Sequence, residues 1–225
     1  MRHKDEIESV QVHYRPETTM EEYRRSYDYK KMRKLIHICG TGHKILDVGC
    51  GGGFIGKILK DNGNDYTGCD LQDGPIRQAR KKGLKVIKAK AQDLPFKDNT
   101  FDIVIMPEVI EHFVETDKAL KELKRVTKPG GKVIVTTPNF TSFRDRILVF
   151  FGHMPAYSMH VDHVKFFNRK RLHDALRKAG LRVKKIYGSA LGIPIPGNAK
   201  LFFFMDSFLP TTMLECLIGV AEKKK

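Results

Sequence analysis

The order of apolar and polar positions changes character along this chain of 225 residues. From Lys44 onward, short apolar runs alternate with longer amphipathic stretches, which predicts a parallel sheet with helices on both faces. The runs predicted to form strands are residues 44–48, 65–69, 85–89, 101–106 and 131–136. Two later runs, 181–187 and 214–221, are predicted to close the sheet as a hairpin-like pair. The pattern therefore predicts an α/β fold with seven strands, mostly parallel, whose last strand is antiparallel.

The amphipathic stretches carry apolar side chains at helical spacing. Residues 117–127 have three such side chains on one face, and a predicted proline–glycine turn follows at 128–131. Residues 170–179 repeat the spacing and end before Gly180. Both stretches stop where glycine or proline cannot continue a helix, so we expect helices that cross over between strands.

Three segments do not fit this alternation. Residues 1–43 precede the first strand and are predicted to form a helical cap, with helix expected around 23–32. Residues 138–168 and 188–213 are predicted insertions in the domain that spans 44–225. Because ligands of open parallel sheets bind beyond the carboxyl ends of the strands, we expect both insertions to flank the ligand crevice. The second insertion contains three adjacent phenylalanines, Phe202 to Phe204.

Composition narrows the setting of the protein. The four cysteines form no CxxC pair. The N-terminus is charged and lacks the apolar segment of a signal peptide, and no apolar run approaches the ~18 residues of a membrane span. We therefore expect a cytoplasmic protein, with peripheral membrane association as an open alternative. The formal net charge of +15 is compatible with RNA, anionic lipid or an acidic metabolite, and equally with a generally solvated basic surface. Oligomeric state is not indicated.

A glycine cluster joins the first predicted strand to an apolar-periodic helix. Residues 45–56 read Ile-Leu-Asp-Val-Gly-Cys-Gly-Gly-Gly-Phe-Ile-Gly, a strand–turn–helix opening that is typical of nucleotide-like cofactor sites. A literal GxGxxG, the pattern of dinucleotide-binding domains, occurs at 51–56. Its register argues against a dinucleotide, because the pattern counted from Gly49 would place its third glycine at Phe54, whose ring would obstruct the pyrophosphate. Asp47 would also repel a diphosphate. An acid there suits a cofactor with a positive amino group.

Several motifs, in this order, resemble the class I S-adenosylmethionine-dependent methyltransferases over roughly residues 44–221. They are the glycine loop, Gly-Cys-Asp-Leu at 68–71, Ala-Gln-Asp-Leu-Pro-Phe at 91–96, Phe-Asp-Ile-Val at 101–104, Glu-Val-Ile-Glu-His at 108–112, and Arg-Val-Thr-Lys-Pro-Gly-Gly at 125–131. The resemblance implies a Rossmann-like methyltransferase domain that takes S-adenosylmethionine as its cofactor.

The resemblance also implies roles for individual residues. Asp47 would meet the methionine amino group, Asp70 the ribose hydroxyls and Asp93 the adenine amino group, although Asp93 would alternatively cap a turn. The residues expected to bind the cofactor are Asp47, Gly49, Cys50, Gly51, Gly53, Asp70, Leu71, Gln92, Asp93, Leu94 and Met106.

Candidates for proton transfer follow the fourth and fifth strands or lie in the first insertion. They are His112, Asn139, His160 and His163. Residues 108–112 also resemble the metal-binding Glu-x-x-Glu-His of ubiquinone-biosynthesis O-methyltransferases and small-RNA 2′-O-methyltransferases. That likeness implies a Mg²⁺ or Mn²⁺ site of Glu108, Glu111, His112 and His163, with Asp162 beside it. Alternatively, the two glutamates are acids favoured in the first turn of a helix, without metal.

Three functions remain open on the sequence alone. The first is methyl transfer to a small-molecule or lipid-like acceptor, which includes O-methylation, and the apolar insertion at 188–213 motivates it. The second is RNA methylation, which the basic charge motivates. The third is a catalytically silent binding protein of the same fold, which a damaged glycine loop or Asp70 would favour; both are intact.

Overall fold

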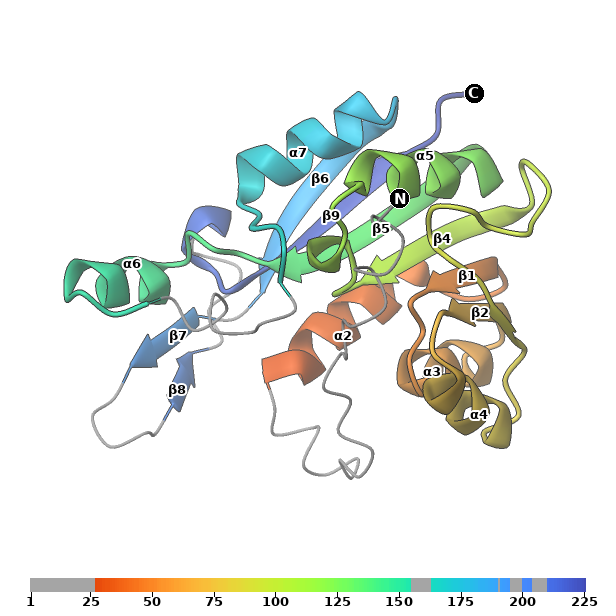
Figure 1. Cartoon of the computed structure of the whole chain (residues 1–225), viewed down its shortest axis with the longest axis horizontal. Coiled ribbons are helices and arrows are strands. Elements are labelled where there is room, and N and C mark those ends of the chain that lie inside the picture. The colour runs from red at the N-terminus through yellow and green to blue at the C-terminus, as the bar shows by residue number, and fades with distance from the viewer. Residues whose placement is uncertain (1–26, 155–162, 190, 195–199, 204–209) are drawn as a thin grey trace, which may run out of the picture.

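A mixed seven-stranded sheet forms the centre of the computed structural model, in the order β3-β2-β1-β4-β5-β9-β6 (Figure 1). The structure describes residues 27–154, 163–189, 191–194, 200–203 and 210–225. The central strands are β1 (Lys44–Val48), β2 (Asp65–Asp70), β3 (Val86–Lys88), β4 (Phe101–Pro107), β5 (Thr127–Pro138), β6 (Arg182–Ser189) and β9 (Cys216–Glu222). β9 is antiparallel to both β5 and β6, which confirms the predicted fold class.

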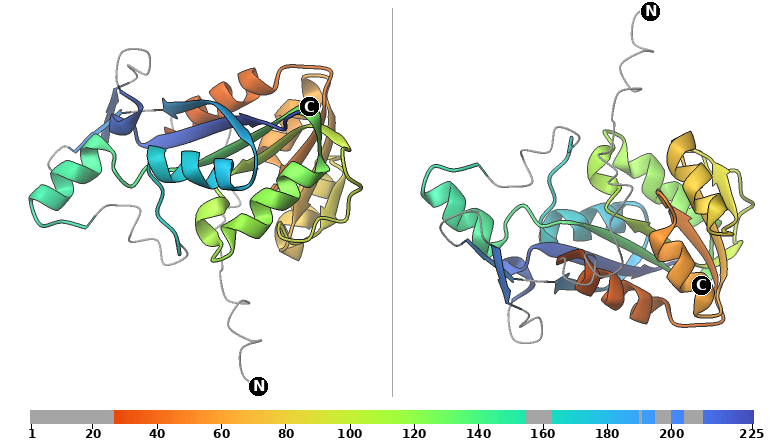
Figure 2. Two further views of the ribbon diagram at one scale, coloured as in Figure 1. Left: turned by 90° about the horizontal axis from the view of Figure 1, so that it is seen from above. Right: turned by 90° about the horizontal axis from the view of Figure 1, so that it is seen from below.

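Helices cover both faces of this sheet (Figure 2). One face carries α2 (Tyr27–Cys39), α3 (Phe54–Asp61) and α4 (Asp73–Lys81), and the other carries α5 (Thr116–Val126) and α7 (Arg169–Lys178). Each layer buries its own apolar core, with Leu35 and Leu59 in the first, and Leu120 and Leu172 in the second. The helical spacing of residues 117–127 and 170–179 therefore predicted the buried faces of α5 and α7 correctly.

The predicted turn at residues 128–131 is part of β5. Thr127 pairs with Phe101, and the register then shifts before Lys132 pairs with Ile103. A Cβ on Gly131 would lie 2.7 Å from the carbonyl oxygen of Asp102. Glycine therefore lets the irregular start of β5 stay against β4, where a larger residue would push the strands apart.

Beyond the carboxyl edge of the sheet lie α6 (Phe143–Phe150) and the antiparallel pair β7 (Leu191–Pro194) and β8 (Lys200–Phe203). They belong to the two predicted insertions and contact each other through α6 and β7. Short 3-10 turns stand at Ile110–His112 and Thr211–Met213. Phe204 of the phenylalanine run lies outside the described residues.

Of the predicted N-terminal cap, the structure describes α2, which packs against α3 and β9. Its buried positions are Lys31, Leu35 and Cys39, one turn apart along a single face. In the part of the chain that the structure describes, no helix combines the length and apolar character needed to cross a membrane.

Candidate active site

The glycine loop between β1 and α3 lies against the end of β2. The amides of Gly49 and Cys50 both donate to the carbonyl oxygen of Cys69, at 2.8 and 3.0 Å. Gly49, Gly51 and Gly53 all have positive φ, between 52° and 76°. A Cβ on Gly49 would lie only 2.4 Å from Cγ2 of Val109, so the loop directly contacts the segment that follows β4. The loop thus connects the ends of three neighbouring strands.

Asp70, at the end of β2, is fixed by the backbone around it. Its Oδ2 accepts from the amide of Gly51 at 2.9 Å, and its Oδ1 accepts from the amide of Gln72 at 2.9 Å. A carboxylate oxygen has further lone pairs, so both can still accept from a ligand. The neighbouring Leu71 has half of its surface exposed. A fixed carboxylate beside an exposed apolar side chain fits a ribose that carries a flat base.

Asp47 has no exposed surface. Its Oδ2 accepts from the hydroxyl of Tyr66 at 2.9 Å, while its Oδ1 has no hydrogen-bond partner among the described residues. Burial raises the pKa of Asp47 to about 7, although the bond from Tyr66 acts in the opposite direction. Asp47 therefore offers no exposed surface to a ligand, and its hydrogen bond is with Tyr66.

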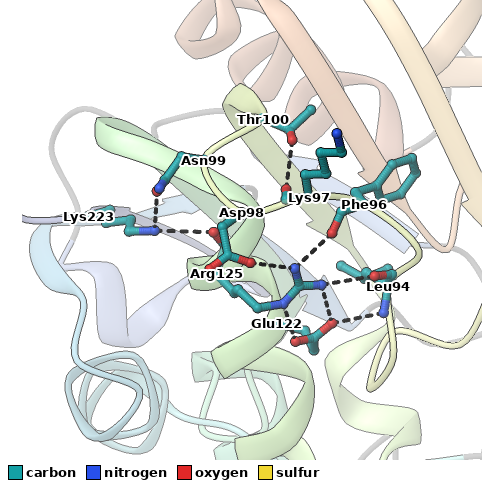
Figure 3. Close-up of polar contacts among 9 residues, drawn as sticks. All are labelled: Leu94, Phe96, Lys97, Asp98, Asn99, Thr100, Glu122, Arg125 and Lys223. Atoms are coloured by element: carbon teal, nitrogen blue, oxygen red, sulfur yellow. Dashed lines mark hydrogen bonds and ion pairs between the residues drawn. The ribbon is translucent and has the colours of Figure 1, made fainter.

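Side chains of α5 hold the segment 91–96 in place (Figure 3). The guanidinium of Arg125 donates to the carbonyl oxygens of Leu94 and Phe96, at 2.9 and 2.7 Å, and pairs with Glu122 and Asp98. Glu122 also accepts from the amide of Leu94 at 2.8 Å. That amide is therefore engaged within the protein and does not point to an adenine. Asp93 is exposed and Gln92 half-buried.

A second group of polar side chains lies after β4. One ligand atom each from Glu111, His112 and His163 lies within 4.8 Å of the others, and the two imidazole centroids are 5.0 Å apart. The carbonyl oxygen of Glu111 accepts from the amides of Val164 and Lys165, at 3.1 and 3.0 Å, which brings His163 to this place. Two imidazoles and a carboxylate at this spacing suit a divalent cation or a proton-transfer group.

The environment of Glu111 changes its acidity. Its side chain is buried, and its Oε2 has no hydrogen-bond partner in the described part of the chain. Burial, and to a lesser degree the negative charge of Glu108, raise the pKa of Glu111 well above its ordinary value. A small recess opens beside it, lined by Phe140, His163 and Phe166.

Comparisons with known proteins agree with this geometry. Residues 46–135 match the model of the methyltransferase domain family. A ubiquinone biosynthesis O-methyltransferase of Pseudomonas fluorescens is 32% identical over 183 residues, which cover 74% of this chain and 75% of that protein. The chain belongs to the class I S-adenosylmethionine-dependent methyltransferases. It is therefore an enzyme of a family whose methyl donor is S-adenosylmethionine.

Two further likenesses are more limited. A probable tRNA methyltransferase 9B of Mus musculus is 33% identical over 136 residues, 58% of this chain but only 30% of that protein. The crystal structure of a putative methyltransferase from Bacillus halodurans superposes with a TM-score of 0.69 at 17% identity, covering 87% of this chain and 100% of that one. At that identity the second likeness supports the fold alone.

Two site predictions for this methyltransferase do not agree with its structure. Met106 is completely buried in the core between β4 and α5, so it offers no surface to a cofactor. Cys50 is buried, and its Sγ lies 2.8 Å from where a Cβ on Gly68 would stand, so a contact of Cys50 with the cofactor stays a prediction. Asn139 is buried, and its amide nitrogen donates to the carbonyl oxygen of Leu214 at 2.7 Å. It joins the end of β5 to the segment before β9 and is not a proton-transfer group.

The four predicted metal ligands also do not come together as one set. Glu108 is absent from the group because its Oε2 pairs with Lys31, 3.0 Å away. His160 and Asp162 lie outside the described residues.

Sequence reasoning missed Tyr66, Arg125 and Lys31. Arg125 is the first residue of the motif at 125–131, so the sequence did contain a signal for it. Lys31 interrupts the apolar face that Leu35 and Cys39 continue, and Tyr66 had no signal in the sequence pattern.

Proposed function

We propose that this methyltransferase transfers a methyl group from S-adenosylmethionine to a hydroxyl of a small, lipid-like acceptor. The group of Glu111, His112 and His163 carries the proposal, because it lies after β4, next to the segment that contacts Gly49. Imidazole and carboxylate are the side chains that take a proton from a hydroxyl near neutral pH. An amine acceptor would depend less on such a base, because its nitrogen has a lone pair that can attack the methyl group before a proton is removed.

The direction of the cofactor follows from the positions of the acids. With the ribose at Asp70 and the adenine near the exposed Asp93, the base lies on the β3 side of the crevice. The methionine and the sulfonium then extend across the glycine loop toward β4. That direction presents the methyl group to the side on which Glu111, His112 and His163 lie.

Transfer to oxygen is an in-line displacement, so the protein mainly aligns the two partners and excludes water. His112 and His163 are half-buried and stand as the proposed bases. Asp47, buried at the end of β1, is proposed to act on the loop through Tyr66, whose hydroxyl donates to its Oδ2. Alternatively, Glu111, His112 and His163 would hold a divalent cation, which would lower the pKa of the acceptor hydroxyl in place of an imidazole base.

The lipid-like character of the acceptor is supported by an exposed apolar surface of the first insertion. The C-terminal part of α6 and the residues after it expose Val149, Phe150, Phe151 and Met154, each by more than half of its surface. Contiguous exposed apolar side chains are characteristic of sites that bind apolar partners. The relative from Pseudomonas fluorescens is named for ubiquinone biosynthesis. Peripheral contact with a membrane would bring such an acceptor to the enzyme.

A screen with radiolabelled S-adenosylmethionine tests the proposal. Hydroxylated quinone precursors and phenols with an apolar tail should accept label, and alkyl amines should not. The same reactions with Mg²⁺, with Mn²⁺ and with a chelator decide whether a cation takes part. Label on amines alone would contradict the proposal. Cofactor binding by calorimetry without turnover on any acceptor would instead favour the silent binding protein.

A second candidate is methylation of tRNA, favoured by one specific observation. The basic side chains of Lys121, Lys124 and Lys223 line a surface recess with Arg125, on a chain of net charge +15. The partial likeness to a mouse protein named as a probable tRNA methyltransferase points the same way. Binding to bulk tRNA should then weaken steeply between 50 and 200 mM salt. Absence of binding at 50 mM salt would remove this candidate.

A further inference from the structure

Lys31 is a buried cation on a face that should be apolar. In α2 the residues Lys31, Leu35 and Cys39 follow one another at four-residue spacing, and all three face the sheet. The side chain of Lys31 is 2% exposed. Burying an ammonium is costly unless a partner carries the opposite charge. The position of Lys31 therefore depends on the group that it meets.

That group is Glu108, the first residue after β4. Oε2 of Glu108 lies 3.0 Å from Nζ of Lys31, and its Oε1 accepts from the hydroxyl of Thr136 at 2.6 Å. The thiol of Cys216 lies 3.6 Å from the same Oε1. The backbone of Glu108 has φ of +53°, an uncommon value for a residue with a side chain. Contacts from α2, β5 and β9 thus hold this carboxylate in one orientation.

This arrangement divides the acidic residues of the site into two sets. Glu111 joins His112 and His163, while Glu108 is neutralised by Lys31. A cation near Glu111 would also meet the positive charge of Lys31, which acts on Glu111 as well. Lys31 lies outside residues 46–135, the part of the chain that matches the family model, so the feature belongs to the N-terminal helix.

We propose that Lys31 is a positioning residue that occupies Glu108 as an internal counter-ion and thereby keeps this carboxylate from binding a divalent cation with Glu111, His112 and His163. The N-terminal helix is then part of the acceptor side of the site and sets its affinity for cations. The inference rests on the proposed role of Glu111, His112 and His163. The remaining three ligands bind a cation weakly, since a fourth ligand and its negative charge are withheld.

The test measures Mn²⁺ affinity directly, from the free Mn²⁺ signal in electron paramagnetic resonance. Lys31→Met removes the ammonium and keeps an apolar chain of similar length. We expect its Kd for Mn²⁺ to be at least tenfold lower than that of the wild type. In the double variant Lys31→Met with Glu108→Gln, the Kd should return to the wild-type value, because the freed carboxylate is gone.

Lys34→Met is the matched control. Lys34 lies one turn further along α2, where its Nζ donates to the carbonyl oxygen of Gly188 at 3.2 Å and lies 4.9 Å from the centroid of the Tyr187 ring. The substitution Lys34→Met removes the same charge from the same helix without affecting the contacts of Glu108, so the Mn²⁺ affinity of this variant should stay within twofold of the wild type. If Lys31→Met does not fold, Lys31→Gln gives the same comparison.

The inference would be overturned by an unchanged Kd for Mn²⁺ in Lys31→Met. It would also be overturned by an equal increase of Mn²⁺ affinity in Lys34→Met, or by an increase that persists in the double variant. Absence of Mn²⁺ binding by the Lys31 variant would do so too. Calorimetry with S-adenosylmethionine on the same preparations tests the methyltransferase proposal separately, because the cofactor crevice does not include Lys31. A loss of cofactor binding therefore cannot be mistaken for a failure of the counter-ion role.

Discussion

Tyr66 and Asp47 meet beneath the glycine loop, where the tyrosine hydroxyl donates to the carboxylate across 2.9 Å. A Cβ on Gly56 would lie 2.3 Å from the Tyr66 ring, so α3 packs directly against Tyr66. The buried acid and the buried phenol thus lie next to the glycine loop, which is proposed to bind the cofactor. Because both side chains are buried, we expect any effect of the pair on cofactor binding to pass through the loop.

The first prediction concerns Asp47→Asn and pH. Because the folded pKa of Asp47 is about 7 against an ordinary 3.8, the folded protein keeps a proton there that the unfolded chain loses. The free energy of unfolding of the ligand-free protein should therefore fall as pH rises from about 4 to 7. Asp47→Asn removes this loss and should stabilise the apoprotein at pH 8, by up to about 4 kcal/mol. Urea denaturation at pH 5 and pH 8 measures the difference, and a gain that is the same at both pH values would contradict it.

Asp70→Asn should weaken cofactor binding. The change removes the negative charge and replaces one acceptor oxygen with a donor, opposite the amides of Gly51 and Gln72. A charge-assisted hydrogen bond contributes about 1.5–3 kcal/mol, so the Kd for S-adenosylmethionine should rise by roughly 10- to 100-fold. Titration calorimetry gives this Kd directly. Asp73→Asn is the control, since that acid is exposed at the start of α4 and pairs with Lys88.

Arg125→Met should affect the cofactor without touching it. The guanidinium joins the carbonyl oxygens of Leu94 and Phe96 to Glu122 (Figure 3), so its loss frees the segment that is proposed to line the adenine side of the crevice. We expect cofactor affinity to fall by about 3- to 10-fold, equivalent to roughly 1 kcal/mol. Lys124→Met, one position earlier on α5, should leave it unchanged. If Arg125→Met and Lys124→Met bind S-adenosylmethionine with the same Kd, the position of the segment 91–96 does not depend on Arg125.

Asn139→Ala distinguishes a structural asparagine from a catalytic one. Its side chain donates to the carbonyl oxygen of Leu214 and accepts from the amide of Thr141, all within the protein. Losing these bonds in a buried place should cost about 2–4 kcal/mol, which lowers the melting temperature by roughly 5–15 °C. At 20 °C the kcat of the folded variant should stay within about threefold of the wild type. A loss of 100-fold or more in kcat, without a change in melting temperature, would restore the catalytic role.

The local pattern was sufficient for most of the fold. Alternating apolar runs predicted all seven strands of the central sheet, and the spacing of residues such as Leu120 and Leu172 predicted which helix faces are buried. The main local error was at residues 128–131, because proline and glycine permit an irregular strand as readily as a turn. The helix α6 was not predicted, since its apolar residues lie around the helix without a single buried face.

The candidate site was predictable only as far as its motifs are contiguous. The glycine loop and Asp70 converge as expected because adjacent parallel strands end at one edge. Met106 failed because alternation along β4 turns its side chain into the core, and Asn139 failed because its partners come from residues 141 and 214. These contacts depend on where distant segments meet.

By itself, the sequence determined the order of strands and helices, the glycine loop and the acids at the ends of β1 and β2, because periodicity and backbone freedom are properties of neighbouring residues. Only the tertiary structure decided which acids act together. Glu108 and Glu111 are three residues apart, yet one meets Lys31 from α2 and the other meets His163 from beyond β5. Burial and charge pairing between segments that are distant along the chain separate them, and no local pattern records either.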